Sequence, residues 1–544
     1  MSDAGVGRAS LFIASGTIVS RVLGLVRAMI LAYAIGVSLS PGADAFAVAS
    51  RIPNTIYTLV ATGVLSAVLV PQITKAALAR DGGRGYINKL VTIAIVGSGA
   101  MMLVAVAIAP VLVKLLGATW PADQLQLATM FAYWLLPQIL FYTLYTVLGE
   151  VLNAKSLFGP YAWAPVLNNV LNIAGMLAFV ALYGPDPDGH RDVDAWSTGG
   201  MALLAGSATL GVAAQALVLF LFWKRAGLSF RPDFAWRGMG LAQTGRIASW
   251  TFASVIVTQV VGFVNGSVMN IASGTGAALA ASDMAGWIFV LPHSIITISL
   301  VTAYFTRMSE NVHRNRMDLF KQDLSSSARL AGFAMMFFSV TLVVLAFPIS
   351  RLMQPSASDV GVSSLAIVLI ANLIGLVPFS LLFVFNRGFF AMSDTKTPFL
   401  ITAGQSALTL LASAYCATLP PEMITATLSG FVSLLLGAQA VTTVLVLRRR
   451  IGVLGGRALT RSLVQSLLGA LLSAAGGFGT LLLLGGIGAD SFVVAGFGQA
   501  FVSCALIFII MAGIYAGAMF ALGNREMLGL WNRVGAPLAR KFRR

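Results

Sequence analysis

Two arginines stand inside the first apolar stretch of the chain, where charged side chains are rare. Arg21 and Arg27 are six residues apart, far from either end of a run at residues 9–37. If this run crosses a membrane, an arginine at that depth costs about 2.5–3.5 kcal/mol and needs a compensating interaction. Guanidinium groups hold phosphate oxygens bidentately, and two or three of them suit a pyrophosphate. The pattern favours an anion site in a water-filled cavity. The alternatives are pairing with a buried acid or with backbone carbonyls, snorkelling to the membrane surface, and a wrong span assignment.

The second apolar stretch adds a third arginine and an acid. Asp44, Arg51 and Thr58 recur at i, i+7 and i+14, which puts them on one face of a helix. Arg51 is expected to face the same cavity, and Asp44 to orient an arginine or gate the outer side. Direct pairing of Asp44 with Arg51 is the other interpretation. The membrane segments of the first half otherwise offer only Glu150 as an acid, so positive charge is in excess there. Asn54 and Thr58 are expected as secondary contacts.

These residues must be positioned by membrane-spanning helices. Of 544 residues, 58% are hydrophobic and 10% are charged, and the mean hydropathy is +0.87, which excludes a soluble fold. An apolar run of roughly 20 residues crosses a bilayer as a helix. Fourteen such spans are predicted, at residues 9–37, 43–74, 89–116, 124–153, 158–184, 198–223, 241–271, 279–306, 328–350, 362–386, 396–418, 424–447, 462–487 and 491–523.

The net charge of +16 is explained by orientation better than by nucleic-acid binding. Basic residues gather in alternate loops, at residues 75–89, 224–246, 307–329 and 448–461, and in the tail after residue 524. The positive-inside rule places these segments, and both termini, in the cytoplasm. Within them, residues 318–329 are interpreted either as a short amphipathic helix lying on the inner face or as an ordinary polar loop.

The chain contains an internal repeat. Residues 8–27 match residues 246–265 at an offset of 238, and Asp44 recurs as Asp283 at an offset of 239. Two six-helix lobes related by an axis along the membrane normal are therefore predicted, followed by two extra helices. That design favours alternating access. The predicted parts are an N-lobe at 1–226 (helices 1–6), a C-lobe at 227–452 (helices 7–12), helices 13 and 14 at 453–523, and a basic cytoplasmic tail at 524–544.

The two copies of the repeat differ at the arginines. Arg21 and Arg27 correspond to Gln259 and Asn265, so packing alone does not require the charges. The two amides are expected as secondary contacts. A pump for lipophilic cations would bury acids, so the sign of the charge argues against one.

Other chemistry is not indicated. The sequence has no nucleophile and base constellation and no phosphate-binding loop, so no enzyme is expected. Three histidines and the isolated Cys416 and Cys504 predict no metal site. Asn168, Asn169 and Asn172 are interpreted as interhelical hydrogen bonds, with ligand contacts as the alternative. Prolines inside the spans indicate hinges or static bends.

Three segments resemble the MurJ (MviN) lipid II flippase family of the multidrug/oligosaccharidyl-lipid/polysaccharide exporter superfamily. They are S-R-V-L-G-L-V-R at 20–27, A-D-A-F-A-V-A-S-R-I-P-N at 43–54 and D-T-K-T-P at 394–398. The resemblance runs through all the predicted helices. It implies a V-shaped bundle, a cationic central cavity for the diphosphate and sugar head group, and a groove beside helices 13 and 14 for the polyprenyl tail.

The resemblance also assigns substrate-binding residues. They are Arg21, Arg27, Asp44 and, in place of a lysine, Arg51. A family arginine of helix 2 falls at Tyr57, and one of helix 8 falls near Trp287, so the first lobe is expected to carry most of the charge. The acids of a sodium site in helices 7 and 11 are not evident.

The sequence thus predicts a flippase of the bacterial cytoplasmic membrane that carries lipid II outward. No cofactor is expected. An inside-negative potential would favour outward movement of an anion by roughly 2.3 kcal/mol per charge per 100 mV, so coupling to the potential or to an ion is a hypothesis. Expected partners are lipid II or a similar polyprenyl-pyrophosphate saccharide, membrane lipids and cell-wall synthesis proteins, but not nucleic acid. The alternatives are an exporter of another polyprenyl-linked saccharide and a scaffold for wall-synthesis proteins.

Overall fold

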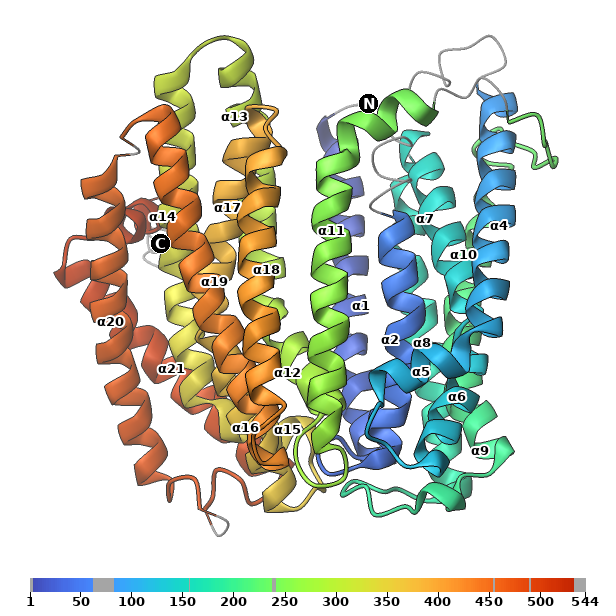
Figure 1. The fold of residues 1–544 in the computed structure, drawn as a ribbon. Coiled ribbons are helices and arrows are strands. Elements are labelled where there is room, and N and C mark those ends of the chain that lie inside the picture. Colours follow the sequence, from blue (N-terminus) through green and yellow to red (C-terminus); the bar gives the residue numbers. More distant parts are fainter. Residues whose placement is uncertain are drawn as a thin grey trace. The chain divides into compact units, whose positions relative to one another are not determined.

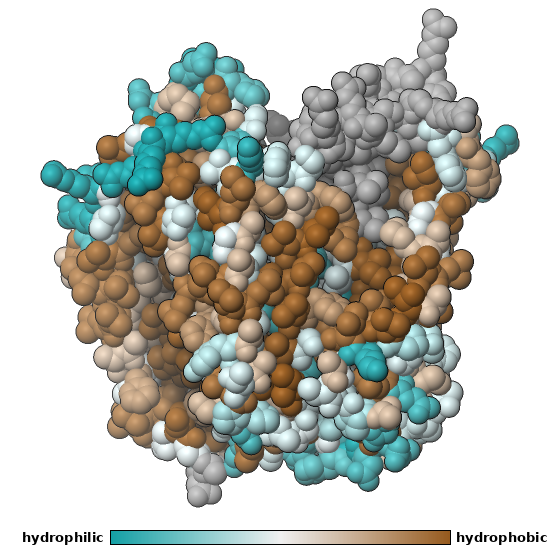
Figure 2. Space-filling model, viewed as in Figure 1, coloured by the Kyte–Doolittle hydropathy of each residue, from teal (hydrophilic) through white to brown (hydrophobic). Residues whose placement is uncertain are grey.

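The computed structural model describes residues 3–61, 83–155, 157–236, 241–453, 455–488 and 491–532, and its regular elements there are all helices. Thirteen segments of this part are long and apolar enough to cross a membrane, and each overlaps a predicted span. The all-α membrane fold is confirmed. The predicted span at 43–74 corresponds to α2 (Pro41–Val60), and its remainder lies outside the described residues. Figure 2 shows hydrophobic residues covering the middle stretches of the helices and hydrophilic residues gathered at their ends.

Contacts divide the chain into two compact units, of which the first holds residues 1–274 and 278–280. Its longer helices are α1 (Asp3–Ile35), α2, α4 (Arg84–Ala107), α5 (Ala109–Leu116), α6 (Ala122–Leu135), α7 (Gln138–Ala154), α8 (Phe158–Tyr183), α10 (Ser207–Leu217) and α11 (Leu241–Met269). The short α9 (Thr198–Met201) and the π-turn η3 (Ala202–Gly206) lead into α10. In this unit α8 packs between α1 and α10, α2 packs on α6, and α4 packs on α7 (Figure 1).

The second unit holds residues 275–277 and 281–544. Its helices are α12 (Leu279–Pro292), α13 (Ile298–His313), α14 (Met317–Val344), α15 (Ala346–Met353), α16 (Asp359–Leu373), α17 (Leu376–Ala391), α18 (Lys396–Cys416), α19 (Pro421–Ile451), α20 (Gly456–Leu483), α21 (Phe497–Ala521) and α22 (Arg525–Leu530). A π-turn, η6 (His293–Thr297), joins α12 to α13. Helix α14 packs on α17 and α20, α20 packs on α21, and α19 packs on α17 and α18.

Helix α11 packs with the first unit, although the repeat assigns it to the second half. Its C-terminal end is held by three hydrogen bonds. Trp120 Nε1 donates to the carbonyl of Asn270 at 2.9 Å, Asn270 Nδ2 donates to the carbonyl of Leu116 at 2.9 Å, and Ser267 Oγ donates to the carbonyl of Leu115 at 2.9 Å. The predicted boundary at residue 226 rests on the repeat and stays a prediction, since packing units and repeats need not coincide.

Residues 318–329 differ from both sequence interpretations. They form the first turns of α14, which continues unbroken into its apolar part, so they are neither a separate surface helix nor a loop. Phe320 and Leu324 are buried in the core of the second unit. Asp323 pairs with Arg307 at 2.8 Å. At this end of α14 only one face of the helix, which holds Phe320 and Leu324, packs against the rest of the unit. The other faces hold polar residues, and these interrupt the apolar pattern of the sequence.

The buried asparagines of α8 bear out the interhelical interpretation in two of three cases. Asn168 Nδ2 donates to Gln215 Oε1 at 2.8 Å, which links α8 to α10. Asn169 Nδ2 donates to the carbonyl of Ser20 at 2.9 Å, which links α8 to α1. Asn172 instead donates to Asn168 Oδ1 in the same helix, at 3.3 Å. The bond from Asn169 helps to fix α1, the helix that carries both arginines, against α8.

Gly211 lies where α10 packs closely against α8. A methyl group there would stand 2.8 Å from the backbone oxygen of Asn168. Because backbone gives way less easily than the tip of a side chain, Gly211→Ala is expected to destabilise the fold by about 1–3 kcal/mol. Gly97→Ala is the matched control, since a methyl group there would meet nothing within 4 Å. Thermal unfolding of the detergent-solubilised proteins should give a lower Tm only for Gly211→Ala, and equal Tm values would contradict the packing.

The D-T-K-T-P segment begins α18. Asp394 accepts hydrogen bonds from the backbone N–H of Thr397 at 3.0 Å and from its hydroxyl at 2.6 Å, and it pairs with Arg450 of α19. Burial raises the pKa of Asp394, but the bonds from Thr397 and Arg450 outweigh burial and hold this pKa below its usual 3.8. The motif therefore starts one helix and ties it to the next.

A carboxyl with a depressed folded-state pKa stabilises the fold above its unfolded pKa, and this contribution is lost as the pH falls through the folded value. Asp394→Asn is therefore expected to lower the Tm at pH 7 and to flatten the fall in Tm below pH 4. The control is Asp318→Asn, which changes an exposed acid. Parallel Tm curves for wild type and Asp394→Asn between pH 7 and pH 3 would refute the assignment.

Candidate anion-binding site

Arg27 lies where α1 passes from an exposed into a buried half. Ile18 and Val22 before it are 61% and 56% exposed, whereas Ala28 and Ala32 after it are 2% and 1% exposed. At about 100° per residue, position 27 lies roughly 180° around the helix from position 18. Arg27 therefore points away from the exposed face, toward the inside of the first unit.

Arg27 interacts electrostatically with Tyr142 of α7. The ring of Tyr142 packs against that of Tyr57 from α2, with centroids 5.2 Å apart and an interplanar angle of 33°. Tyr57 Oη lies 2.6 Å from Thr146 Oγ1, which itself donates to the carbonyl of Tyr142 at 3.0 Å. Because Thr146 already donates its hydroxyl proton to the carbonyl of Tyr142, the hydroxyl of Tyr57 is the donor in its bond with Thr146. Three helices thus bring one guanidinium and two phenols together.

Among the described residues no carboxylate lies within ion-pair distance of Arg27. In that same part of the chain the hydroxyl of Tyr142 makes no hydrogen bond. A partly buried cation without a counterion is unfavourable within a membrane span unless water or a ligand solvates it. A phenol with a free donor beside it can add a hydrogen bond to an oxyanion. Arg27 and Tyr142 therefore have the chemistry to bind a phosphate group.

Arg21 is partly buried and lies on another side of α1 from Arg27. The helix runs unbroken through Gly24, so the six-residue spacing leaves the two arginines about 120° apart around its axis. Arg21 lies close to the exposed face that holds Ile18 and Leu25, 61% and 39% exposed. One straight helix face therefore does not present both guanidinium groups to a ligand.

Arg51 reaches from α2 to α11. Its Nη2 donates to the carbonyl of Gly262 at 3.0 Å. Gly262 and Gly266 lie beside the guanidinium, and a methyl group at either position would stand 3.4 Å or 3.6 Å from its nitrogens, which is an ordinary van der Waals distance. The sequence had suggested a cavity position or a bond to Asp44. A backbone carbonyl on α11 as partner was not foreseen.

Asp44 anchors the segment that follows α11. It is 1% exposed, and its two carboxylate oxygens accept from Ser273 Oγ at 2.7 Å and from the backbone N–H of Ala280 at 3.0 Å. Ala280 is the second residue of α12, and the first N–H groups of a helix lack partners in the helix itself. Asp44 thus caps α12 from another helix. Gln124 Nε2 donates to Ser273 Oγ at 2.9 Å and extends the network.

The predicted secondary contacts have different surroundings. Thr58 Oγ1 donates to the carbonyl of Asn54 at 2.8 Å, and Asn54 Nδ2 donates to that of Ser50 at 3.2 Å, so both bond to their own helix. Gln259 and Asn265 are partly buried on α11. Gln259 makes no hydrogen bond within the described part of the chain, which leaves its amide available.

Sequence reasoning missed several polar side chains inside the spans. Tyr57 was noted only as the position where a family arginine is absent, and Tyr142 not at all. In the second unit, Arg387 lies 5.2 Å and 5.0 Å from the ring centroids of Phe305 and Phe383. His293 Nδ1 lies 2.8 Å from Ser380 Oγ. The usable signal was a polar residue within an apolar span, which is costly wherever it has no partner.

Comparison with known families gives one match over most of the chain. The sequence profile described as "Lipid II flippase MurJ" matches residues 31–515. A Vibrio cholerae protein named probable lipid II flippase MurJ is 26% identical over 418 residues, which cover 72% of this chain and 74% of the relative. A Burkholderia cenocepacia protein named lipid II flippase MurJ is 28% identical over 423 residues, covering 75% and 77%.

Solved structures show the same architecture. A lipid II flippase MurJ in an inward closed conformation aligns with a TM-score of 0.70 at 17% identity, covering 94% of this chain and 100% of that chain. An inward-facing multidrug resistance MATE family transporter of the MOP superfamily aligns with a TM-score of 0.64 at 14% identity, covering 80% and 96%. At these identities the likeness establishes the fold alone.

Proposed function

The chain belongs to the lipid II flippase MurJ family, and from that membership we propose that it moves lipid II from the inner to the outer leaflet by alternating access. The protein is a multi-pass protein of the bacterial cytoplasmic membrane. Transport of this kind requires a site for the charged head group, while the polyprenyl tail stays in the bilayer.

The observation that carries the proposal is Arg27. It points into the first unit beside Tyr142, and in the described residues it has no carboxylate partner. A pyrophosphate would supply the missing negative charge and would accept hydrogen bonds from both side chains. Arg21, on the neighbouring side of α1, and Arg51, on α2, would add charge as the cargo moves. Gln259 has a free amide for the sugar or the phosphate.

Outward movement of an anion is favoured by the inside-negative potential, at roughly 2.3 kcal/mol per charge per 100 mV. The membrane potential is therefore a sufficient driving force in this proposal. The absence of acids that match the family's sodium site in helices 7 and 11 gives no reason to add sodium coupling.

The test is complementation of a flippase-depleted strain, with lipid II exposure on the outer face followed by a probe that cannot cross the membrane. The full chain is expected to restore both growth and exposure. Collapsing the potential should then lower exposure, and unchanged exposure would reject coupling to voltage. Failure of the full chain to restore exposure, despite normal membrane insertion, would reject lipid II as the cargo and favour another polyprenyl-linked saccharide.

A scaffold that recruits wall-synthesis proteins through its basic segments is the alternative from a different class. Removing residues 533–544 deletes the end of the basic tail and leaves Arg27 in place. A flippase is expected to keep complementing without this segment, whereas a scaffold that depends on it should fail.

A further inference from the structure

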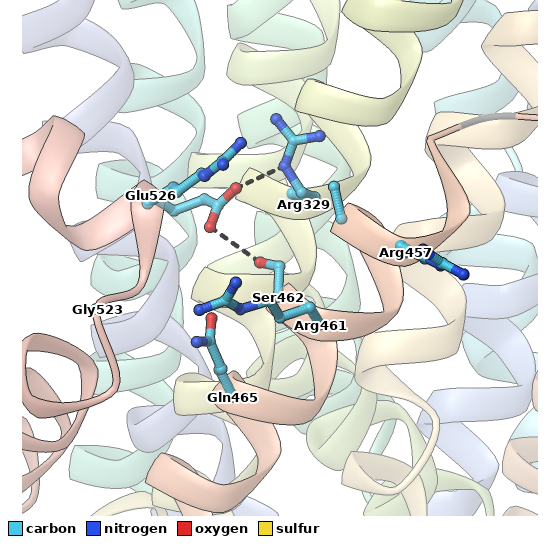
Figure 3. A pocket seen from close by; sticks show the side chains of 9 residues that line it. Arg329, Arg457, Arg461, Ser462, Gln465, Gly523 and Glu526 are labelled. Atoms are coloured by element: carbon cyan, nitrogen blue, oxygen red, sulfur yellow. Dashed lines mark hydrogen bonds and ion pairs between the residues drawn. The ribbon is translucent and has the colours of Figure 1, made fainter.

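A second concentration of arginines lies in the second unit, where α14, α20 and α22 meet (Figure 3). They surround a pocket of about 240 Å³. We call it the basic pocket, and the side chains that matter are Arg329, Arg457, Arg461, Ser462, Arg525 and Glu526. Ser462 points from α20 toward Glu526, and the side chain of Arg461 extends beside Gln465.

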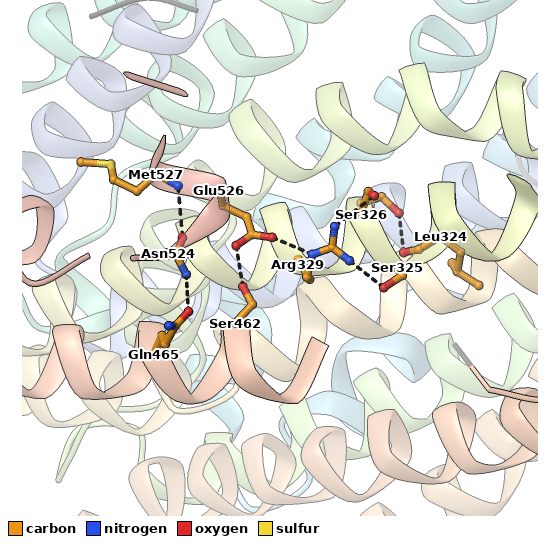
Figure 4. Close-up of polar contacts among 10 residues, drawn as sticks. Leu324, Ser325, Ser326, Arg329, Ser462, Gln465, Asn524, Glu526 and Met527 are labelled. Atoms are coloured by element: carbon orange, nitrogen blue, oxygen red, sulfur yellow. Dashed lines mark hydrogen bonds and ion pairs between the residues drawn. The ribbon is translucent and has the colours of Figure 1, made fainter. Parts of the chain in front are cut away.

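The only acid among these side chains is used within the protein. Glu526 is 8% exposed, and its two oxygens accept from Arg329 Nε at 2.6 Å and from Ser462 Oγ at 3.0 Å (Figure 4). Arg329 also donates to the hydroxyls of Ser325 and Ser326 at 2.9 Å and 3.2 Å. This network neutralises Arg329 and fixes the three helices to one another.

The other arginines of the pocket are not neutralised. Arg457, Arg461 and Arg525 are exposed and form no ion pair or hydrogen bond with any described residue. The pocket also lies at the N-terminus of α20, a helix of 28 residues whose N-cap, Gly455, has no side chain to cap the first N–H groups. A helix N-terminus carries partial positive charge and free donors. The basic pocket is therefore built to hold an anion.

The surroundings of the pocket indicate that this anion belongs to a lipid. Toward its middle, α20 exposes a run of leucines, namely Leu467, Leu468, Leu471 and Leu472, at 42%, 52%, 54% and 57% exposure. Trp531, just after α22, is 46% exposed and packs edge-on against Phe520 with centroids 5.6 Å apart. Exposed tryptophans beside arginines mark the level of the lipid head groups. By the positive-inside rule this level is that of the inner leaflet.

We propose that the basic pocket binds the phosphodiester head group of an anionic phospholipid from the cytoplasmic leaflet, with its acyl chains lying along the exposed leucines of α20. Basic pockets between membrane helices on the cytoplasmic side bind lipid head groups of this kind. A pocket of about 240 Å³ is large enough for a glycerol phosphate head group. The bound lipid clamps α14, α20 and α22 together.

The test uses the purified full-length protein and short-chain phosphatidylglycerol or phosphatidylcholine, with lipid binding followed by native mass spectrometry and by the shift in Tm. Wild type is expected to bind phosphatidylglycerol preferentially and to gain thermal stability from it. The double variant Arg457→Gln/Arg461→Gln is expected to bind it about tenfold more weakly, or worse, since each surface arginine contributes to attraction of an anionic lipid. Arg231→Gln/Arg316→Gln removes the same charge from exposed positions elsewhere and should bind like wild type.

If the double variant does not fold, Arg525→Gln removes one exposed cation and should weaken binding several-fold. Equal binding of phosphatidylglycerol by wild type and pocket variants, or equal binding of the two lipids by wild type, overturns the proposal. Displacement of the lipid by inorganic phosphate assigns the pocket to a soluble anion. Displacement by a polyprenyl pyrophosphate at lower concentration assigns it to the cargo. Either result also overturns the proposal.

Discussion

Arg27→Ala is expected to abolish complementation of a flippase-depleted strain while the variant still reaches the membrane. A charged hydrogen bond contributes about 1.5–3 kcal/mol, so loss of the guanidinium should slow outward movement of lipid II by roughly ten- to a hundredfold. The effect should exceed that of Arg21→Ala, because Arg21 lies near the exposed face of α1. Lipid II exposure on the outer face, normalised to the amount of protein in the membrane, measures both.

Two controls separate binding from packing. Tyr142→Phe removes only the free hydroxyl beside Arg27 and should reduce transport by less than Arg27→Ala, at an unchanged Tm. Arg231→Ala removes an exposed arginine of the same unit and should transport normally. Wild-type transport by Arg27→Ala would remove the basis of the proposed site.

Asp44→Ala is expected to cause the largest loss of stability, about 2–4 kcal/mol, because it leaves the hydroxyl of Ser273 and the N–H of Ala280 without their acceptor in a buried place. The segment after α11 and the start of α12 should then lose their anchor. Thermal unfolding in detergent measures the effect. Protection of the Ala280 amide against hydrogen exchange should fall as well.

Ser273→Ala is the control for Asp44, since it removes the Ser273 bond to Asp44, and with it the bond from Gln124, but keeps the charge and the bond from Ala280. It should lower the Tm in the same direction by a smaller amount. If Asp44→Ala instead keeps the wild-type Tm and loses transport, the carboxylate acts on the arginines or the cargo and the anchoring role is wrong.

The spans could be predicted from the sequence because a bilayer fixes both the length and the composition of a crossing helix. The continuity of residues 318–329 with α14 could not, since most residues of this stretch are polar or charged and do not resemble a membrane span. Its extension depends on Phe320 and Leu324, four residues apart, which pack on the core of the second unit. Such a stripe is visible only once its neighbours are known.

The candidate site was predictable in its composition and less so in its geometry. The spacing of Arg21 and Arg27 fixes their relative direction, because a helix turns by a constant angle. The partners of Arg27 and Arg51, by contrast, could not be predicted from spacing within one helix. Tyr142 and Gly262 lie far along the chain, and which of them meets an arginine depends on how α1, α2, α7 and α11 pack. The periodicity of residues within one helix contains no information about how that helix packs against the others.

The bond from Arg51 to the carbonyl of Gly262 has a thermodynamic consequence for transport. A head group that draws this guanidinium to itself must compete with a main-chain oxygen of α11, so occupancy and the attachment of that helix are linked. The linkage is reciprocal: a change that loosens α11 strengthens capture of the cargo, and one that fastens the helix weakens it by the same factor. Binding of the lipid II head group by Arg51 can thereby release α11 from this hydrogen bond.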